Sequence, residues 1–251
     1  MRPDEYAVMR AAEDRHWWYR ALRGLVRLHW GRHVAPACPG RPRLLDVGCG
    51  TGANLAALAG VAEPFGVDVS PLAIAACRAR GLTAAAIASA ASLPFPAASF
   101  DAVLSCDMLN NRSLPDRHVP LREMARVLRP AGALLLSVPA YQGLLSPHDE
   151  AYGQDRRFTR RELAGLLRAT GFEVAAATYW NSLLLPAAAS ARLWRRRFPG
   201  RPGSDLAVTQ PTIGPGKLLA AILALERALL RLAPLPFGLS VFVVGRRSGV
   251  T

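Results

Sequence analysis

Three glycines at alternate positions form the clearest local pattern in the chain. Residues 44–47 are a short apolar run typical of a buried strand, and Gly48, Gly50 and Gly52 follow it directly. Glycine has no Cβ atom, so a turn built from it can be tight and can bring the backbone close to a ligand. A helix is expected after the turn, where free N–H groups and the positive end of the helix dipole favour an anionic group. The pattern therefore predicts a ligand-binding turn between a strand and a helix.

A carboxylate lies where a nucleotide-like ligand needs one. Residues 65–69 predict a second strand, and Asp68 lies near its end. An acid at the end of the second strand of a nucleotide-binding unit accepts hydrogen bonds from ribose hydroxyls. The glycines are spaced G-x-G-x-G, whereas the dinucleotide fingerprint is G-x-G-x-x-G. The turn and the acid together indicate a nucleotide-like cofactor, and the alternative is an unrelated strand-to-helix turn.

Strands and helices must alternate for these residues to meet. Apolar runs predict further strands at residues 101–105 and 133–138, and a helical pattern covers residues 121–128 between them. Buried strands that alternate with helices are typical of a parallel sheet covered on both faces. We therefore expect an α/β fold in which the strand ends carry the glycines and Asp68.

Capping residues and two late strands complete this pattern. Ser70 ahead of Pro71 has the residue types of a helix start. Thr159 followed by Glu162 is the sequence of a capping box. The last strands are expected at residues 172–179 and 239–246.

These motifs together resemble those of the class I methyltransferases that use S-adenosylmethionine. Residues 46–52, Asp-Val-Gly-Cys-Gly-Thr-Gly, match the first motif of that family residue for residue, and residues 66–70 resemble its second. The similarity continues into the family's fourth strand and the turn before its fifth, at residues 93–95, 99–103 and 126–132.

The resemblance implies a doubly wound α/β fold around a mostly parallel, seven-stranded sheet with an antiparallel last strand. The first residues are expected to form an N-terminal helical lid. The family usually joins its last two strands by a near-hairpin, so a helical insertion is expected between them in this chain. We divide the chain into a lid, an S-adenosylmethionine-binding domain, an insertion, and a final strand with a tail, at residues 1–41, 42–181, 182–237 and 238–251.

The resemblance also implies roles around S-adenosylmethionine. The three glycines would wrap its methionine part, Asp46 would hold its ammonium group directly or through water, and Asp68 would hold its ribose. Ser89 stands where the family commonly has an acid for the adenine amino group, so a hydroxyl or backbone groups would serve instead. The residues expected around the cofactor are Asp46, Gly48, Cys49, Gly50, Gly52, Asp68, Val69, Ser89, Ala90, Cys106 and Asp107.

Both flanks carry a narrower resemblance. Residues 13–19, 146–150 and 156–158 look like a bacterial subgroup of these enzymes. Members of that subgroup are often tied to lipid-linked glycan or natural-product pathways. The resemblance therefore implies a small-molecule acceptor without fixing which one.

Transfer of a methyl group to a hydroxyl also needs a group that accepts the hydroxyl proton. His148 beside Asp149 follows the fifth strand and is the first candidate for this base, with His16 second. The alternative for His148 is a structural histidine that ties down its loop. The family often has Glu-His soon after its fourth strand, whereas this chain has Asn110 and Asn111. No base is therefore expected at that position.

Aromatic residues near the N-terminus are candidates for contact with the acceptor. Trp17, Trp18 and Tyr19 could form a lid over the cofactor and the acceptor, or they could dock their helix on the core. Three further residues are placed at the acceptor pocket from their positions in the chain: Tyr141, Tyr179 and Asn181.

The insertion, residues 182–237, carries a helix with leucines at near-helical spacing. The apolar stripe expected on it consists of Leu218, Leu219, Ile222, Leu225, Leu229 and Leu232, opposite Arg227 and Arg231. Arginines cluster ahead of it at residues 192–201. The stripe could cap a pocket for an apolar acceptor, pack on the core, or rest on an anionic membrane surface.

Composition bounds these alternatives. The chain has 251 residues, of which 51% are apolar, and its formal net charge is +13, almost all from arginine. It has no apolar run long enough to span a membrane and no N-terminal secretion signal, so a cytoplasmic location follows, with peripheral contact at the inner membrane face as an open alternative. The four cysteines lack metal-ligand spacing, so reduced thiols and no metal are expected.

The sequence therefore predicts methyl transfer from S-adenosylmethionine to a small molecule. The expected acceptor group is a hydroxyl of an apolar, glycosidic or lipid-linked metabolite. One alternative is a non-methylating enzyme of the same fold, such as a cyclase. Another is a basic protein that binds or modifies nucleic acid, which the charge favours. Because no target-base motif such as Asn-Pro-Pro-Tyr follows the fourth strand, no nucleic-acid partner is expected, and the oligomeric state stays open.

Overall fold

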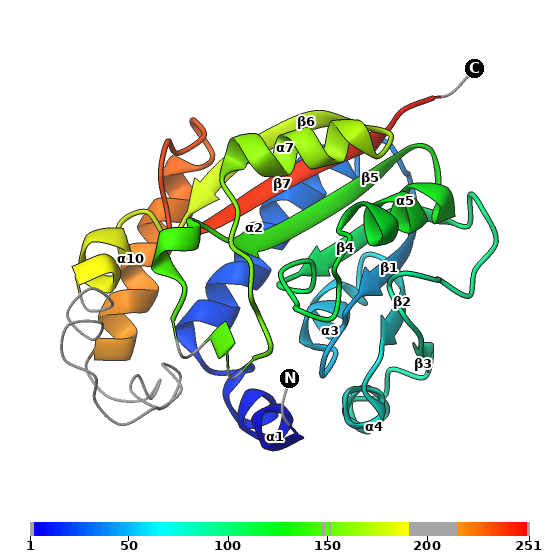
Figure 1. Ribbon diagram of the computed structural model, residues 1–251. Coiled ribbons are helices and arrows are strands. Elements are labelled where there is room, and N and C mark those ends of the chain that lie inside the picture. Colours follow the sequence, from blue (N-terminus) through cyan, green and yellow to red (C-terminus); the bar gives the residue numbers. More distant parts are fainter. Residues whose placement is uncertain (1–2, 147–148, 151, 191–214, 250–251) are drawn as a thin grey trace.

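The computed structural model describes residues 3–146, 149–150, 152–190 and 215–249 (Figure 1). Two helices open the chain, α1 (Pro3–Ala12) and α2 (Trp17–His33). Helix α2 follows the apolar spacing of its sequence, because Leu22, Leu25 and Trp30 are all buried. The dense polar and aromatic cluster at residues 13–19 therefore spans the break between the two helices.

A seven-stranded sheet forms the centre of the molecule (Figure 1). Its strands are β1 (Arg43–Val47), β2 (Glu63–Asp68), β3 (Ala85–Ile87), β4 (Phe100–Cys106), β5 (Leu128–Pro139), β6 (Phe172–Trp180) and β7 (Ser240–Arg247). Their order is β3-β2-β1-β4-β5-β7-β6. All pairs from β3 to β5 are parallel, and β7 runs antiparallel to both β5 and β6. The predicted mostly parallel sheet with an antiparallel last strand is confirmed, whereas the short strand β3 was not predicted.

Helices cover both faces of the sheet. Side chains alternate along each strand, so Leu45 and Val103 pack with one set of helices while Leu44 and Leu104 pack with the other. The first set is α5 (His118–Val127) and α7 (Arg160–Ala169), and the second includes α2, α3 (Ala53–Leu58) and α4 (Pro71–Ala79). The result is a three-layer α/β/α domain.

The predicted helix starts are present. The Ser70 side chain accepts the N–H of Ala73, and Pro71 is the first residue of α4. Thr159 and Glu162 form the reciprocal capping box at the start of α7. A further short 3-10 helix, η1 (Gln142–Leu144), follows β5.

The strand order reverses next to β1. From β1 the chain first builds outward through β2 and β3, and it then returns to the other side of β1 with β4 and β5. Open α/β sheets bind ligands at such a switch point, beyond the carboxyl ends of the strands. The glycine turn after β1, Asp68 in β2 and the residues after β4 all lie at this edge.

The insertion helix α10 (Pro215–Leu229) packs against α2 with a face different from the one predicted. Leu223, Glu226 and Leu230 are buried. Four leucines of the predicted stripe are exposed instead: Leu218, Leu225, Leu229 and Leu232. Of the three alternatives for the stripe, packing on the core does not hold for these four leucines. Spacing alone does not identify the buried side, because leucines lie around the whole helix. The arginine cluster at residues 192–201 lies outside the described residues.

Many arginines bond to backbone carbonyls. Arg27 and Arg41 donate to carbonyls of residues 57–62 at the end of α3. Arg32 of α2 donates to the carbonyls of Leu230 and Arg231, just past α10. Cations at the carboxyl end of a helix satisfy unpaired carbonyls and complement the dipole. Part of the large positive charge therefore has a structural use.

Candidate active site

The glycine turn between β1 and α3 has a left-handed backbone that glycine adopts readily. Gly48, Gly50 and Gly52 have positive φ angles of 78°, 53° and 82°, which side chains with a Cβ atom rarely adopt. A Cβ atom on Gly48 would lie 2.6 Å from Cγ of Met108, and one on Gly52 would lie 2.9 Å from Sγ of Cys77. Gly48 and Gly50 line a cleft, whereas Gly52 does not and faces α4 instead. Gly52, which was expected beside the methionine part of the cofactor, therefore lies where α4 packs against the turn.

Asp68 connects the turn to β2. Its Oδ2 accepts the backbone N–H of Gly50 at 3.0 Å, and its Oδ1 accepts that of Ser70 at 2.9 Å. Each carboxylate oxygen has a further lone pair, and Asp68 lines the cleft. It can therefore hold the turn and still accept hydrogen bonds from sugar hydroxyls.

Asp46 lies below the cleft at the end of β1. Its side chain is only 1% exposed, and within the described part of the chain neither carboxylate oxygen has a hydrogen-bond partner. Burial raises the pKa of this carboxyl well above its usual value, and the nearby Cys77 and Asp68 raise it further. A buried carboxylate without a donor is costly, so this position favours a cationic or hydrogen-bond-donating group.

The cleft has a volume of about 730 Å³. Ligand sites commonly have volumes of roughly 300–1,000 Å³. Six further residues expected around the cofactor line it: Cys49, Val69, Ser89, Ala90, Cys106 and Asp107. The Ser89 hydroxyl accepts the N–H of Ala91 at 3.2 Å, so it is fixed in place at the wall.

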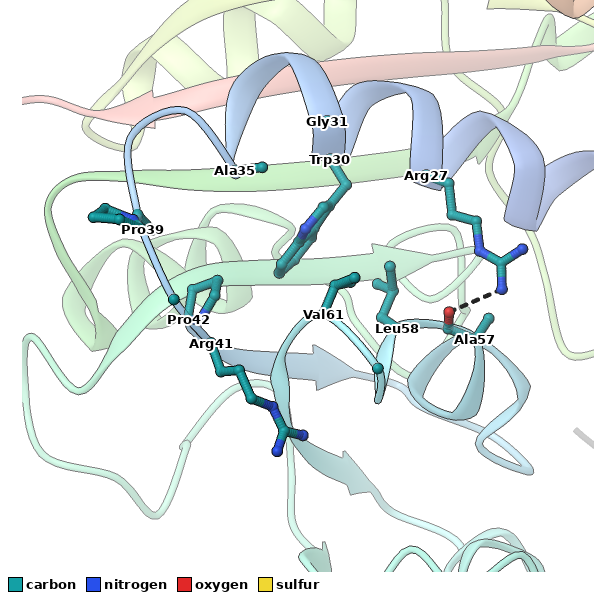
Figure 2. Close-up of a pocket in the computed structure, with 13 residues that line it drawn as sticks. Arg27, Trp30, Gly31, Ala35, Pro39, Arg41, Pro42, Ala57, Leu58 and Val61 are labelled. Carbon is teal, nitrogen blue, oxygen red and sulfur yellow. Dashed lines mark hydrogen bonds between the residues drawn. The ribbon is translucent and has the colours of Figure 1, made fainter.

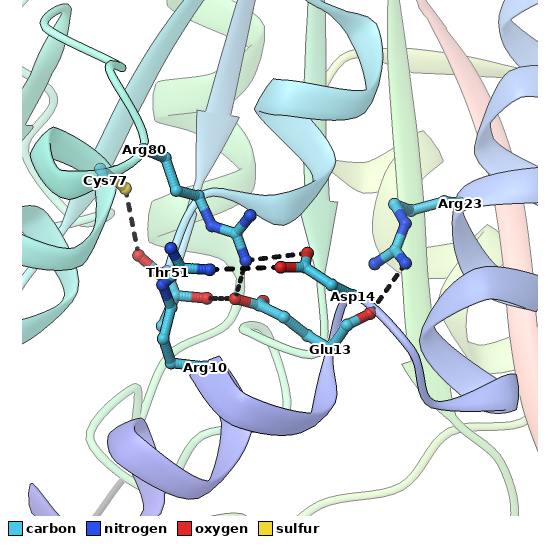
Figure 3. Close-up of polar contacts among 8 residues, drawn as sticks. Arg10, Glu13, Asp14, Arg23, Thr51, Cys77 and Arg80 are labelled. Atoms are coloured by element: carbon cyan, nitrogen blue, oxygen red, sulfur yellow. Dashed lines mark hydrogen bonds and ion pairs between the residues drawn. The ribbon is translucent and has the colours of Figure 1, made fainter. Parts of the chain in front are cut away.

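The end of α1 is fastened to the glycine turn, as Figure 3 shows. Thr51 donates its hydroxyl to the Glu13 carboxylate, which also pairs with Arg80. Arg80 reaches Asp14 at 3.0 Å, and Arg23 donates to the Glu13 carbonyl at 2.8 Å. Glu13 is 3% exposed, so this network is desolvated and strong. It holds the N-terminal helices against the cleft.

The aromatic cluster at residues 16–19 both lines the cleft and packs its helix against the sheet. His16, Trp17, Trp18 and Tyr19 all line the cleft. His16 also caps α2, since its Nδ1 accepts the N–H of Trp18 at 3.3 Å. The Trp18 ring lies 5.5 Å from the ring of Trp180 in β6. The cluster therefore covers the cleft and also packs α2 onto the sheet.

Asp149 is occupied by an arginine. Both of its carboxylate oxygens accept from Nη2 of Arg157, at 2.7 and 2.9 Å, and the two side chains are 2% and 3% exposed. Its Oδ2 also accepts from the backbone and the hydroxyl of Ser146. His148, the first candidate for the base, lies outside the described residues. The structure therefore gives Asp149 a firm role in holding its loop.

The three residues placed at the acceptor pocket lie in two different locations. Asn181 lines the cleft, is 2% exposed, and has a side-chain oxygen with no partner among the described residues. Tyr141 and Tyr179 do not line it; their rings stack 5.4 Å apart, and the Tyr179 hydroxyl accepts the N–H of Arg160. Burial, followed by Tyr179, raises the pKa of Tyr141 to about 12. The structure thus places these two tyrosines away from the cleft, next to the start of α7.

Glu226 of α10 holds the loop that carries Asn181. Its carboxylate accepts the backbone N–H of Asn181 at 2.6 Å and that of Leu183 at 3.0 Å. Burial raises the pKa of Glu226, and these backbone hydrogen bonds oppose that rise. The insertion thus holds one wall of the cleft in place, through a contact that no pattern in the sequence indicates.

Known proteins resemble the chain over the same region. A family model described as a methyltransferase domain matches residues 45–136. A protein of Mycolicibacterium smegmatis named "Probable S-adenosylmethionine-dependent methyltransferase" is 32% identical over 174 residues, which are 68% of this chain and 64% of that protein. Residues 45–136 thus match the methyltransferase domain family, and the chain is similar to S-adenosylmethionine-dependent methyltransferases.

Two more proteins that are similar to this chain are informative. The 27-O-demethylrifamycin SV methyltransferase of Amycolatopsis mediterranei is 36% identical over 115 residues, 41% of this chain and 42% of that protein. The crystal structure of the (4+2)-cyclase SpnF has a TM-score of 0.58 and 27% identity, covering 92% of this chain and 83% of that one. The chain thus spans 64% and 42% of the two curated relatives' lengths.

The residues of the cleft fit S-adenosylmethionine, the cofactor named for the Mycolicibacterium relative. The buried carboxylate of Asp46 lacks a donor, and the ammonium group of the cofactor is one. Gly48 and Gly50 leave the cleft floor without side chains, and a Cβ atom on Gly48 would have no room. Asp68 offers carboxylate lone pairs at the same wall.

A second hollow lies at the opposite edge of the sheet, between α2 and α3 (Figure 2). Trp30, Leu58 and Val61 line it, and Arg27 crosses it to bond to the Ala57 carbonyl at 3.0 Å. It contains neither the glycine turn nor an acid. We therefore place the active site in the first cleft. The described residues contain no group of His, Cys, Asp and Glu placed to hold a metal ion.

Proposed function

We propose that this chain transfers the methyl group of S-adenosylmethionine to a hydroxyl of an amphipathic small molecule. The observation that carries the proposal is a single cleft with two kinds of wall. The glycine turn and Asp68 line one part of the cleft, and a mixed polar and apolar surface lines the rest. One cavity can therefore hold both the cofactor and an acceptor.

In this proposal each end of the cofactor has its own residues. Gly48 and Gly50 lie along its methionine part, Asp46 balances its ammonium group, and Asp68 accepts from its ribose. Ser89 and Ala90 lie along its base. When bound, the sulfonium supplies an electrophilic methyl group. The protein's part is to position the acceptor oxygen and exclude water.

Sheet order divides the acceptor half of the cleft. The side of the cleft at the loops after β4 and β5 is the richer in polar groups, with Asn111, Ser113, Asp149, Tyr152, Gln154 and Arg157 beside Met108, Leu114 and Pro139. The side at α2, β6 and β7 carries more apolar surface, with Trp17, Trp18, Leu184, Ala188 and Leu239 beside Asn181 and Ser240. Because β4 and β5 precede β7 and β6 in the sheet, polar and apolar groups are unevenly distributed across the cleft. An acceptor with a polar end and an apolar body matches this distribution.

The relative from Amycolatopsis supports an oxygen acceptor, because its name gives the position it methylates as an oxygen of rifamycin. Its substrate name also supports a sizeable small molecule. Because the similarity covers 41% of this chain, these features of the relative are used to choose the probes.

The test has two steps. Calorimetry measures binding of S-adenosylmethionine to the wild type and to Asp68→Ala; we expect binding, and a loss of at least tenfold in the variant. The protein is then incubated with S-adenosylmethionine labelled in its methyl group and with two probes, n-octyl β-D-glucopyranoside and 27-O-demethylrifamycin SV. Label in a low-mass product supports the proposal. Absence of cofactor binding would refute it.

A cyclase-like activity is the second candidate. It is favoured by the similarity to SpnF, whose title names a (4+2)-cyclase. Cofactor binding without label transfer, together with a product of unchanged mass from a polyene probe, would select this candidate over methyl transfer.

Peripheral membrane contact is a separate proposal about location. Leu218, Leu225, Leu229 and Leu232 present an exposed apolar strip on and just past α10, and the chain carries a net charge of +13. No helix among the described residues has both the length and the apolar character needed to cross a bilayer. We therefore propose a cytoplasmic protein whose α10 rests on anionic lipid. Failure to sediment with phosphatidylglycerol vesicles at low salt would refute this contact.

A further inference from the structure

Asp107 has the geometry of a reacting carboxylate. It is the first residue after β4, at the sheet edge where ligands bind, and it lines the cleft beside the glycine turn. Its φ angle is 54°, a conformation that aspartate tolerates better than most residues. Its backbone N–H donates to the Ser137 carbonyl at 2.9 Å, which fixes the residue at the end of two strands. Local strain of this kind is often found at functional sites.

Two other candidates for a base, Asp149 and His16, already accept hydrogen bonds, and His148 lies outside the described residues. Both carboxylate oxygens of Asp149 accept from Arg157, and its Oδ2 also accepts from Ser146. Neutral histidine has one acceptor nitrogen, and in His16 it is the Nδ1 that caps α2. In contrast, no described donor bonds to the carboxylate of Asp107.

From this placement we propose that Asp107 is the general base that takes the proton from the acceptor hydroxyl. The proposal rests on the proposed methyl transfer, and it gives Asp107 a role different from the cofactor contact expected from the sequence. The acceptor's O–H bond breaks, and its proton moves to a carboxylate oxygen of Asp107. The electron pair of that bond forms the new oxygen–carbon bond. The methyl carbon's bond to sulfur breaks with its electron pair left on sulfur, and the proton later leaves Asp107 for water.

The surroundings of Asp107 suit this task. Burial raises its pKa to about 7, while Arg157 lowers it and Asp149 raises it. Cys106 and Asp46 lie on the adjoining strand ends, and His16 faces the same cleft from α2. A general base works best when its pKa lies near the working pH. Because Arg157 is already paired with Asp149, its charge is not free to hold Asp107 ionised as a salt bridge would.

Two measurements test the proposal without any acceptor. Calorimetry compares S-adenosylmethionine binding to the wild type and to Asp107→Asn, and we expect affinities within about twofold, since this base does not hold the cofactor. A loss of tenfold or more would overturn the proposal and return Asp107 to cofactor binding. Carboxyl-labelled aspartate followed by NMR, with Asp107→Asn to assign the signal, should titrate near pH 7. Titration below about pH 5, close to the ordinary value, would also overturn it.

Turnover supplies the third measurement, with whichever of the two probes the wild type methylates. We expect Asp107→Asn to lower kcat by about 10²–10⁴-fold with little change in KM, and to remove the rise of kcat through pH 7. Asp107→Glu should restore part of the rate. Asp116→Asn, an exposed carboxylate on the loop before α5, is the matched control. An Asp107→Asn variant that keeps more than about a third of kcat refutes the proposal, whereas a wild type without cofactor binding refutes the proposed function instead.

Discussion

Replacing Asp149 by asparagine removes the negative charge from a buried ion pair and nearly keeps the shape of the side chain. Asp149 and Arg157 are 2% and 3% exposed, and Nη2 of the arginine reaches both carboxylate oxygens. In Asp149→Asn the guanidinium stays buried without a counter-charge. Removing one partner of a buried pair costs about 3–5 kcal/mol in unfolding free energy. Because asparagine still accepts one hydrogen bond, we expect the low end, about 3 kcal/mol.

The assay is urea unfolding at pH 7.5, followed by far-ultraviolet circular dichroism. Asp155→Asn is the matched control, since Asp155 pairs with Arg117 at 2.6 Å but is 47% exposed. Exposed pairs contribute at most about 1 kcal/mol. Asp149→Leu combined with Arg157→Met removes both charges, and its stability should lie within about 1 kcal/mol of the wild type. If Asp149→Asn costs no more than Asp155→Asn, the assignment of Asp149 as a structural ion-pair partner is wrong.

Three more predictions follow from buried or strained positions. His29 is 5% exposed, and its pKa is lowered to about 4, mainly by burial. Because the unfolded state binds the proton at a higher pH than the folded state, the free energy of unfolding should fall by about 3 kcal/mol between pH 6.5 and pH 4. Urea unfolding of His29→Phe should show less of this fall. Gly48→Ala puts a Cβ atom at a φ of 78° and 2.6 Å from Met108, so calorimetry should show at least tenfold weaker S-adenosylmethionine binding. Glu226→Gln weakens the anchor of Asn181, so it should raise the KM of the probe acceptor more than that of the cofactor.

Each of these variants has a control of the same type. Gly60→Ala meets nothing within 4 Å and should bind S-adenosylmethionine as the wild type does. His118→Gln, at a side chain that is 41% exposed, should keep the full acid sensitivity. Glu173→Gln, on the exposed face of β6, should leave both KM values unchanged. A control that behaves like its partner variant would contradict the corresponding prediction.

The sequence predicted the parts of the site that depend on local spacing. The glycines follow β1 within the same turn, and Asp68 ends the neighbouring strand, so a regular βαβ arrangement brings them together. The capping box at Thr159 is local for the same reason. These features require only the correct strands and the correct order, and the sheet has both.

The side-chain positions that could not be predicted depend on contacts between segments that are distant in the chain. Tyr179 lies in β6 as expected, yet its ring packs with Tyr141 rather than facing the cleft. The buried side of α10 is set by Glu226 reaching the loop at Asn181, and leucine spacing carries no trace of that contact. Glu13 belongs to the motif at residues 13–19, but its bonds could not be predicted, because its partners Thr51 and Arg80 are far along the chain.

Four carboxylates around the cleft differ in the groups that surround them, and this separates what each can do. Asp149 is buried with a guanidinium, and both of its oxygens accept from it. Asp68 accepts backbone N–H groups and keeps its outer lone pairs for a further donor. Asp46 is buried without a donor, so only an incoming cation or donor can stabilise its charge. Of these four, Asp107 combines a partly buried position that lines the cleft with no hydrogen bond from a described donor.

Environment decides the role of a carboxylate because each neighbour favours one protonation state. Asp149 and Asp68 already accept hydrogen bonds from an arginine and from backbone N–H groups. Burial favours the neutral form, so Asp107 and Asp46 gain most from taking a proton or a cation. The ammonium group of the cofactor can satisfy Asp46, and the acceptor's proton is then left for Asp107. On this reasoning, Asp46→Asn should weaken cofactor binding in calorimetry while Asp107→Asn should not, and equal losses in both variants would show that the two carboxylates share one task.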